Sequence, residues 1–127
     1  MPAGTQISVE EYLKTVYRPD CDYVDGVVEE RNLGEVDHGL VQARFAHVFL
    51  GLYEETGLLA MTEVRMRVRE NTYRIPDVLV TRGKPSRGVL TEPPLLCIEI
   101  LSPEDRTSQV NTRIKDYLEF GVRVVGW

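Results

Sequence analysis

Two apolar stretches decide the fold of this chain, Tyr73-Arg-Ile-Pro-Asp-Val-Leu-Val80 and Leu95-Leu-Cys-Ile-Glu-Ile-Leu101. Short apolar runs bounded by turn residues are typical of strands that are buried on both faces of a sheet. Each run carries one acid, Asp77 in the first and Glu99 in the second. Two buried carboxylates on neighbouring strands repel each other, so something must neutralise them. A divalent cation and arginine partners are both open at this point.

The length and composition describe an ordinary globular protein. The chain has 127 residues, of which 43% are hydrophobic and 28% charged, so we expect a single domain over residues 1–127. No apolar run approaches the roughly 20 residues of a transmembrane helix, and the N-terminus lacks a secretory signal pattern. Cys21 and Cys97 do not make a disulfide framework. The cytoplasm is therefore the expected location.

The charge balance argues against a protein that coats nucleic acid along its length. Fifteen Lys and Arg against 20 Asp and Glu give a formal net charge of −5, without the basic footprint of such a protein. A nuclease is not excluded, because an acidic site that takes up metal contributes part of the negative charge.

The first half of the chain predicts a helix, a hairpin and a second, longer helix. Ser8-Val-Glu-Glu11 is a capping box that predicts a short helix to about Tyr17, and Asp25-Gly26 predicts a hairpin over residues 22–30. The longest helix is predicted from about His38 to Thr56, with Asp37 as its N-cap and Gly57 as its end. One face of it is apolar: Val41, Phe45, Val48, Phe49 and Leu52. His38 opens this helix and either faces a cleft or has a structural role.

Two basic features follow. Residues 59–68 predict a strand, and alternation places Glu63, Arg65, Arg67 and Arg69 on one face of it. These arginines either track a phosphate backbone or form a solvated edge that resists sheet-to-sheet association. The polar loop 81–94 carries a second basic group, Arg82, Lys84 and Arg87.

The last third has the pattern of a βαβ crossover. Ser102-Pro103-Glu104-Asp105 is a helix-start sequence, the helix ends at Gly121, and residues 122–127 predict a final strand. Arg113 falls inside the apolar arc of this helix, Arg106 projects along the same side, and Lys115 points toward solvent. An arginine among core-facing residues needs an anion, and the strand with Glu99 is the nearest source. The pair is either structural or catalytic.

Several of these segments together resemble the bacterial family known as putative restriction endonucleases, within the PD-(D/E)XK nuclease superfamily. They are Arg74-Ile-Pro-Asp77-Val, Pro94 to Arg106, Tyr117, Gly121-Val122, and, nearer the N-terminus, Glu10-Glu-Tyr-Leu13, Tyr23-Val-Asp-Gly26 and His38. The resemblance covers nearly the whole chain. It implies an α/β (α+β) restriction-endonuclease-like fold, in which helices flank a mixed central β-sheet.

The resemblance also implies a site and a reaction. Asp77 and Glu99 would bind Mg²⁺ or Mn²⁺, which would activate a water and stabilise the charge that develops on a phosphodiester of DNA. In most of the superfamily a lysine follows the glutamate by two residues, where this chain has Leu101, and in this family the lysine lies at the position of Arg113. Arginine stabilises phosphate but is a poor proton acceptor because it stays charged.

The expected site follows from these assignments. Its catalytic residues are Asp77, Glu99 and Arg113, with Asp77 and Glu99 as metal ligands. The auxiliary residues and phosphate contacts expected around them are His38, Lys115, Arg65, Arg67 and Arg106.

The end of the chain departs from the family pattern. Residues 121–127 only approximate the family's aromatic-Trp strand, and family members continue with further strands, so the C-terminal part looks truncated. An uncovered sheet edge favours a partner chain, and we expect a homodimer. Three functions are weighed: a metal-dependent endonuclease, a catalytically degenerate member that binds nucleic acid or protein, and an assembly protein with a structural ion-pair core.

Overall fold

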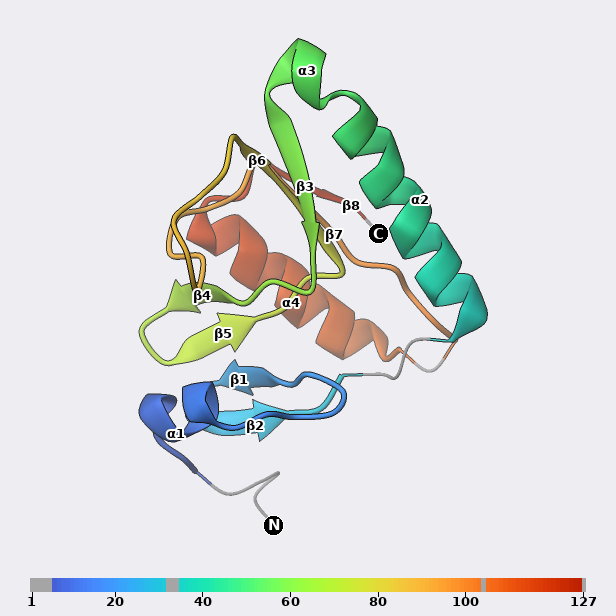
Figure 1. Ribbon diagram of the computed structural model, residues 1–127. Helices are drawn as coiled ribbons and strands as arrows, with labels where there is room; N and C mark the ends of the chain where they lie inside the picture. Colours follow the sequence, from blue (N-terminus) through green and yellow to red (C-terminus); the bar gives the residue numbers. More distant parts are fainter. Residues whose placement is uncertain (1–5, 32–34, 104, 127) are drawn as a thin grey trace.

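Two four-stranded sheets form the framework of the protein (Figure 1). The structure is a computed structural model, and it describes residues 6–31, 35–103 and 105–126. One sheet has the order β2-β1-β5-β4, and the other has the order β3-β6-β7-β8. In the second sheet β7 and β8 are parallel and the other neighbours antiparallel. The prediction of a mixed sheet in an α/β fold is therefore confirmed.

The strands are short and come from both halves of the chain. The first sheet consists of β1 (Asp22–Val24), β2 (Val27–Glu29), β4 (Met66–Arg69) and β5 (Thr72–Arg74). The second consists of β3 (Leu58–Thr62), β6 (Val78–Arg82), β7 (Leu96–Ile98) and β8 (Val124–Gly126).

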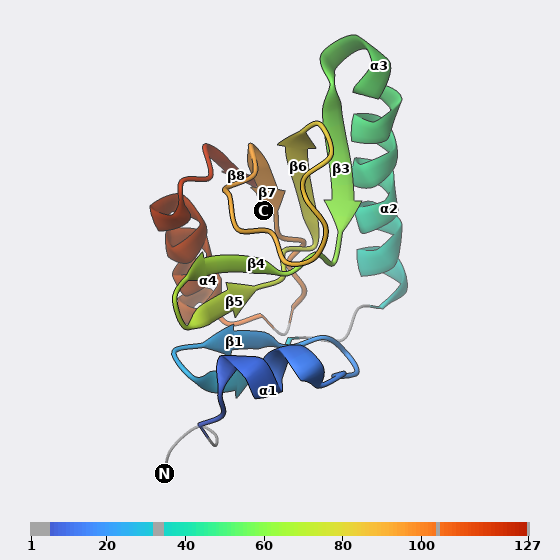
Figure 2. The same cartoon turned by 60° about the vertical axis from the view of Figure 1, so that its left-hand side comes forward.

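Helices cover both faces of the second sheet. The helices of the chain are α1 (Val9–Lys14), which lies against the first sheet, and α2 (Val36–Gly51), α3 (Tyr53–Thr56) and α4 (Thr107–Phe120). Figure 2 shows the β3-β6-β7-β8 sheet between α2 on one side and α4 on the other. Among the described residues, no helix is long and apolar enough to cross a membrane.

The N-terminal elements form as their local sequence predicts. The Ser8 hydroxyl accepts a hydrogen bond from the Glu11 N–H at 3.0 Å, which caps α1, although the helix ends at Lys14 rather than near Tyr17. The hairpin turns at Asp25 and Gly26, whose φ angles of 49° and 92° are those of the expected turn. α1 packs on this sheet through a cluster of buried tyrosines: Tyr12, Tyr23 and Tyr73.

The main core lies between the second sheet, β4 and α4. Leu79 and Cys97 point inward from neighbouring strands, Met66 comes from β4, and Tyr117 comes from α4. Each of these four side chains is fully buried. Cys21 and Cys97 are both buried free thiols, so the expectation that they form no disulfide framework holds.

Two of the predicted strands are each divided between the two sheets. The predicted strand over 73–80 is β5 followed by β6, and the chain crosses between sheets at Ile75-Pro76-Asp77. Proline cannot donate a ladder hydrogen bond, which explains the break at Pro76. The predicted strand over 59–68 is likewise β3 followed by β4, because Glu63 takes a φ of 56° that no strand accommodates.

The long helix also differs from its prediction. α2 begins at Val36 after Glu35 rather than after Asp37, and α3 is a separate turn that ends at Gly57. No side chain of α2 is fully buried, and Phe45 and Val48 are 39% and 57% exposed. The predicted apolar face therefore exists but is only partly covered.

The crossover at the C-terminal end is confirmed. β7, α4 and β8 follow one another, and β8 is parallel to β7 with Cys97 opposite Val125. Gly121 ends α4 with a φ of 114°, which glycine adopts readily. The helix begins at Thr107 with Arg106 as its N-cap, directly after the predicted helix-start sequence, and Glu104 and Trp127 lie outside the described residues.

Candidate functional site

The two acids predicted to form the site lie at the same end of neighbouring strands. β6 and β7 are antiparallel with Val78 opposite Ile98, so Asp77 and Glu99 lie one residue beyond that pair on adjacent chains. Both acids are 4% exposed. Burial is the main cause and the charge of Asp77 the second cause that raises the pKa of Glu99 from 4.5 to about 8. The predicted conflict between two buried carboxylates is therefore present in the fold.

Asp77 is held from three directions. Its Oδ2 accepts a hydrogen bond of 2.7 Å from the backbone N–H of Ile100. Its Oδ1 lies 3.0 Å from Arg31 Nη2 and 3.3 Å from His38 Nε2. His38 lies in the first turn of α2, and this contact brings it to Asp77.

Besides Glu99, the carboxylate of Glu63 also lies close to Asp77, on the other side of Arg31. Arg31 Nη1 contacts Glu63 Oε1 at 2.8 Å, and the Gln42 side chain donates to Glu63 Oε2 at 3.0 Å and to the Asp77 carbonyl at 2.8 Å. Burial disfavours ionisation of Glu63, but the hydrogen bond and charge of Arg31 outweigh it, so the pKa of Glu63 lies below its ordinary value.

Glu99 has a tyrosine rather than an arginine as its hydrogen-bond partner. The fully buried Tyr117 on α4 donates its hydroxyl hydrogen to Glu99 Oε1. Arg113, the predicted partner, is buried as expected, but its Nε lies 3.9 Å from Asp22 Oδ2. Its charge still lowers the pKa of Glu99. The expected Arg113–Glu99 pair is therefore replaced by an Arg113 close to both Asp22 and Glu99.

The Nε atom of Arg113 is a buried donor without an acceptor. Among the described residues, Arg113 Nε is the one buried side-chain nitrogen or oxygen atom that has no hydrogen-bond partner. Such a donor is costly to bury unless something accepts its hydrogen bond. This observation points to an anion as the missing partner of Arg113.

A separate set of residues forms a buried structural ion-pair network. Arg74 is 1% exposed and contacts Asp22 Oδ2 at 3.0 Å and Asp116 Oδ2 at 2.8 Å. Asp22 also accepts the backbone N–H of Ile75 at 3.1 Å, which holds β1 against the start of the 75–77 crossing. This network joins the first sheet to α4, and Glu99 takes no hydrogen bond from it.

The other predicted basic residues lie elsewhere. Arg65 stacks over the Tyr12 ring at 5.4 Å, and Arg67 donates to the Glu70 carbonyl at 3.0 Å. Both belong to the segment of the first sheet, so they do not join the acid pair. Arg106 is the exposed N-cap of α4, and Lys115 points to solvent with Glu119 Oε1 at 3.8 Å.

The donor set fits a hard divalent cation. Two carboxylates converge on adjacent strands, and within the described ranges Glu99 lacks a basic hydrogen-bond partner, so a cation would relieve their repulsion. In the described part of the chain, no three His, Cys, Asp or Glu residues are grouped to hold a metal. Mg²⁺ commonly uses one or two carboxylates and completes its coordination with water and substrate phosphate, so the pair is sufficient.

Comparison with known proteins identifies a family and a similar fold. The model of the Uma2 family, described as putative restriction endonucleases, matches residues 9–127. The chain belongs to this family. Its structure is also similar to the crystal structure of a putative nuclease of DUF820 from Anabaena variabilis, with a TM-score of 0.79 at 21% identity over 94% of this chain and 74% of that one. This second similarity supports the fold. No curated protein matches the sequence.

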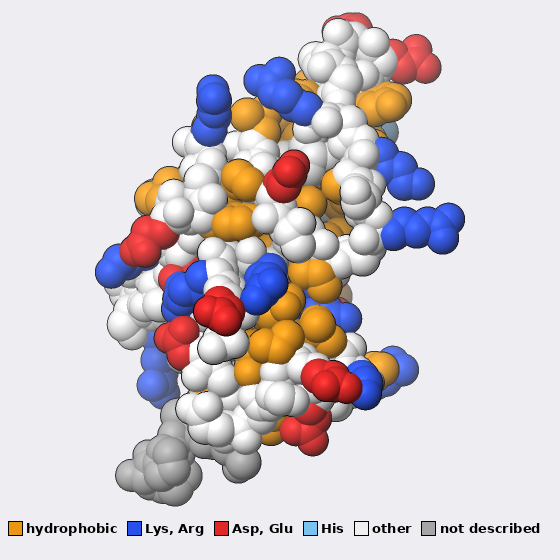
Figure 3. Space-filling view, turned by 90° about the vertical axis from the view of Figure 1, so that its left-hand side faces the viewer, with side chains coloured by type: hydrophobic (Ala, Val, Ile, Leu, Met, Phe, Trp, Pro, Cys, Tyr) orange, Lys and Arg blue, Asp and Glu red, His pale blue; other side chains and the backbone are white. Residues whose placement is uncertain are grey.

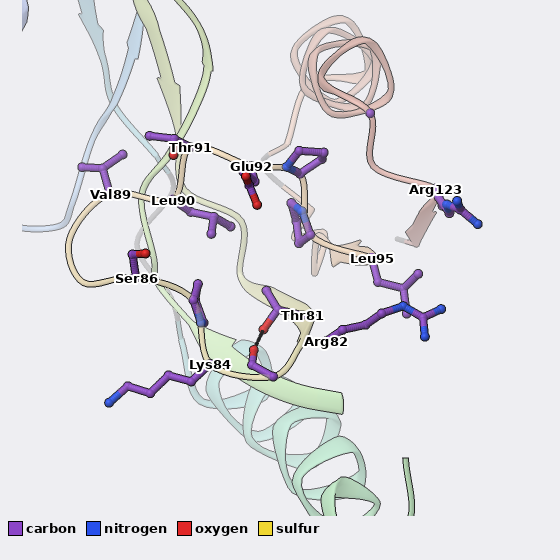
Figure 4. A pocket seen from close by; sticks show the side chains of 15 residues that line it. Thr81, Arg82, Lys84, Ser86, Val89, Leu90, Thr91, Glu92, Leu95 and Arg123 are labelled. Carbon is purple, nitrogen blue, oxygen red and sulfur yellow. Dashed lines mark hydrogen bonds between the residues drawn. The ribbon is translucent and has the colours of Figure 1, made fainter. Parts of the chain in front are cut away.

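A pocket of about 900 Å³ lies at the opposite end of the β6 and β7 strands from the acid pair. It is formed largely by the 81–95 loop, and Arg82, Lys84 and Arg123 line it together with one acid, Glu92. Figure 4 shows Arg82 and Arg123 on the same side of the pocket, with Lys84 extending away from it.

These three cations make no ion pair with any described residue. Figure 3 shows the face on this side of the molecule, with Lys and Arg side chains around a hydrophobic patch. Arg82 and Lys84 of the second basic feature therefore lie on a surface separate from the acid pair, together with Arg123.

Proposed function

We propose that this member of the Uma2 family is a metal-dependent endonuclease that hydrolyses phosphodiester bonds of DNA. One observation carries the proposal: two buried carboxylates, Asp77 and Glu99, meet at one end of adjacent strands, and no basic side chain of the described residues is hydrogen-bonded to Glu99. Family membership supports it. Asp77 and Glu99 would hold Mg²⁺ or Mn²⁺.

The residues of the chain divide the work as follows. When bound, the ion supplies Lewis-acid stabilisation of the phosphodiester and a water of lowered pKa. The N–H of Ile100 fixes the Asp77 carboxylate, and Tyr117 fixes that of Glu99. Arg113 presents a buried, permanently charged donor for a phosphate oxygen. Its constant charge means that it does not accept the proton of the attacking water.

The remaining basic residues have unequal support in this proposal. His38 is placed to orient Asp77 through its Nε2, and Arg106 starts the helix that carries Arg113. Both stay in the proposal as an auxiliary residue and a phosphate contact. Arg65, Arg67 and Lys115 are assigned no role, because their contacts lie away from the acid pair.

Nicking of supercoiled plasmid tests the proposal. Wild type is expected to nick with Mn²⁺ or Mg²⁺ and not with EDTA, and Asp77→Asn is expected to lose the activity. Asp20→Asn removes the same charge from an exposed turn and serves as the matched control. Nicking by Asp77→Asn at the wild-type rate would contradict the proposal.

Nucleic-acid binding without cleavage is the second candidate, and the unpaired cations of the pocket favour it. It predicts salt-sensitive DNA binding that survives Asp77→Ala and is lost in an Arg82→Ala, Arg123→Ala double variant. DNA affinity unchanged in the double variant would remove this candidate.

We also propose a homodimer. Partly exposed apolar side chains on α2 support it, because a partner chain can cover such a surface. Light scattering after size exclusion is expected to give twice the chain mass. A stable monomer at micromolar concentration would contradict it.

A further inference from the structure

Arg31 lies against the acid pair although no sequence pattern assigns it a role. Its side chain is 12% exposed. One end of its guanidinium contacts Asp77 Oδ1 at 3.0 Å, and the other contacts Glu63 Oε1 at 2.8 Å. The same cation therefore joins the proposed metal ligand to a second carboxylate.

Glu63 anchors Arg31 independently of Asp77. The guanidinium meets both carboxylate oxygens, at 2.8 Å through Nη1 and 3.4 Å through Nη2, which is the forked geometry that arginine favours. Gln42 holds Glu63 in turn with a hydrogen bond of 3.0 Å. If the contact with Asp77 were lost, these bonds would still keep Arg31 at the edge of the site.

The contact with Asp77 competes directly with a metal ion. Oδ2 of Asp77 accepts a hydrogen bond from the Ile100 N–H at 2.7 Å, whereas Arg31 and His38 both contact Oδ1. A divalent cation that takes Oδ1 competes with the guanidinium for the same lone pairs, and the two positive charges repel each other. Metal binding at Oδ1 therefore displaces Arg31 from Asp77.

We propose that Arg31 is a substrate-binding residue with two alternative partners. Without a divalent cation it pairs with Asp77, and with the cation bound it stays on Glu63 and offers the freed N–H of its Nη2 to a phosphate oxygen of the nucleic acid. The planar guanidinium suits both partners, because carboxylate and phosphate present similar pairs of oxygens. This assignment rests on the proposed metal-dependent cleavage at Asp77 and Glu99.

A purely structural role explains the contacts of Arg31 less well. The buried acid nearest to it on the first sheet, Asp22, already has Arg74 at 3.0 Å, whereas Arg31 Nε lies 4.0 Å away. The close contacts of Arg31 are therefore with Asp77 and Glu63. A structural residue would weaken metal and DNA binding together when removed, whereas a competing, phosphate-binding residue moves them in opposite directions.

Calorimetric titration with Mn²⁺ tests the competition between Arg31 and a metal ion for Asp77. Arg31→Met, which keeps most of the side-chain volume, and Arg31→Gln are expected to bind Mn²⁺ about tenfold more tightly than wild type, since a charge-assisted hydrogen bond no longer competes. Arg44→Ala removes the same charge from the exposed side of α2 and is expected to stay within about twofold of wild type. Circular dichroism verifies that each variant is folded.

Fluorescence anisotropy with a short DNA duplex and Ca²⁺ tests the contact between Arg31 and a phosphate of the nucleic acid. The two Arg31 variants are expected to bind the duplex about tenfold more weakly, despite their tighter hold on metal. Mn²⁺ affinity equal to or weaker than that of wild type would overturn the assignment, and so would unchanged DNA affinity. If neither wild type nor variants bind Mn²⁺, the proposed metal function itself fails.

Discussion

Replacement of Glu99 by glutamine is expected to remove a large pH dependence from the stability of the metal-free protein. In the folded state the pKa of Glu99 is about 8, because burial and the Asp77 charge disfavour its ionised form, whereas an unfolded chain ionises near 4.5. Below pH 4.5 both states hold the proton and no stability is lost. Between 4.5 and 8 the unfolded state releases it first, so the free energy of unfolding falls as pH rises.

The magnitude follows from the same two values. Each unit of pKa difference corresponds to about 1.4 kcal/mol, so the full shift corresponds to about 5 kcal/mol between pH 4.5 and 8. Glutamine keeps an oxygen that accepts the Tyr117 hydroxyl hydrogen but carries no charge. The variant should therefore resemble wild type at pH 5 and exceed it by several kcal/mol at pH 8.

Urea denaturation in EDTA at pH 5, 6, 7 and 8 measures this difference. Other titrating groups are common to both proteins, so subtraction of the two stability curves isolates Glu99. A difference that grows by roughly 1 kcal/mol per pH unit agrees with the burial of Glu99 beside Asp77. Parallel curves over this range would refute the reasoning.

Three further substitutions test neighbouring parts of the site. Tyr117→Phe removes the hydroxyl that lowers the pKa of Glu99, so carboxyl NMR should find that pKa higher than in wild type, and a fall would contradict the hydrogen bond. Arg74→Met removes the buried cation that Asp22 and Asp116 share and should cost about 3–5 kcal/mol in urea denaturation, whereas a loss under about 1 kcal/mol would contradict a structural network. Arg113→Ala should lower the nicking rate about 100-fold, while the exposed Lys115→Ala stays within about twofold, and equal losses would contradict the assignment to Arg113.

The acid pair could be predicted because its signal is local and chemical. An acid in a strand buried on both faces is rare enough to require a partner, and Asp77 and Glu99 stand in two such runs. The crossover after Glu99 was predictable as well, since its helix ends at a glycine and returns to a short apolar strand. Its chirality and register bring Tyr117 and Arg113 to the buried side.

The surroundings of the pair could not be predicted in the same way. Glu63 leaves its strand with a positive φ, so strict alternation placed it on the wrong face with three arginines. Arg31 comes from a polar segment without periodicity, and its contacts join residues 32 and 46 positions away in the chain. The division at Pro76 did have a signal, because proline interrupts a central strand.

Calorimetric titration of the wild-type protein and Asp77→Ala with Mn²⁺ tests the central claim most directly, because it needs neither a substrate nor a recognition site. The account predicts saturable binding to wild type and its loss in the variant, since one of the two carboxylates of the pair is gone. Absence of Mn²⁺ binding to folded wild type, or equal binding by the variant, would contradict the claim that Asp77 and Glu99 form a metal site.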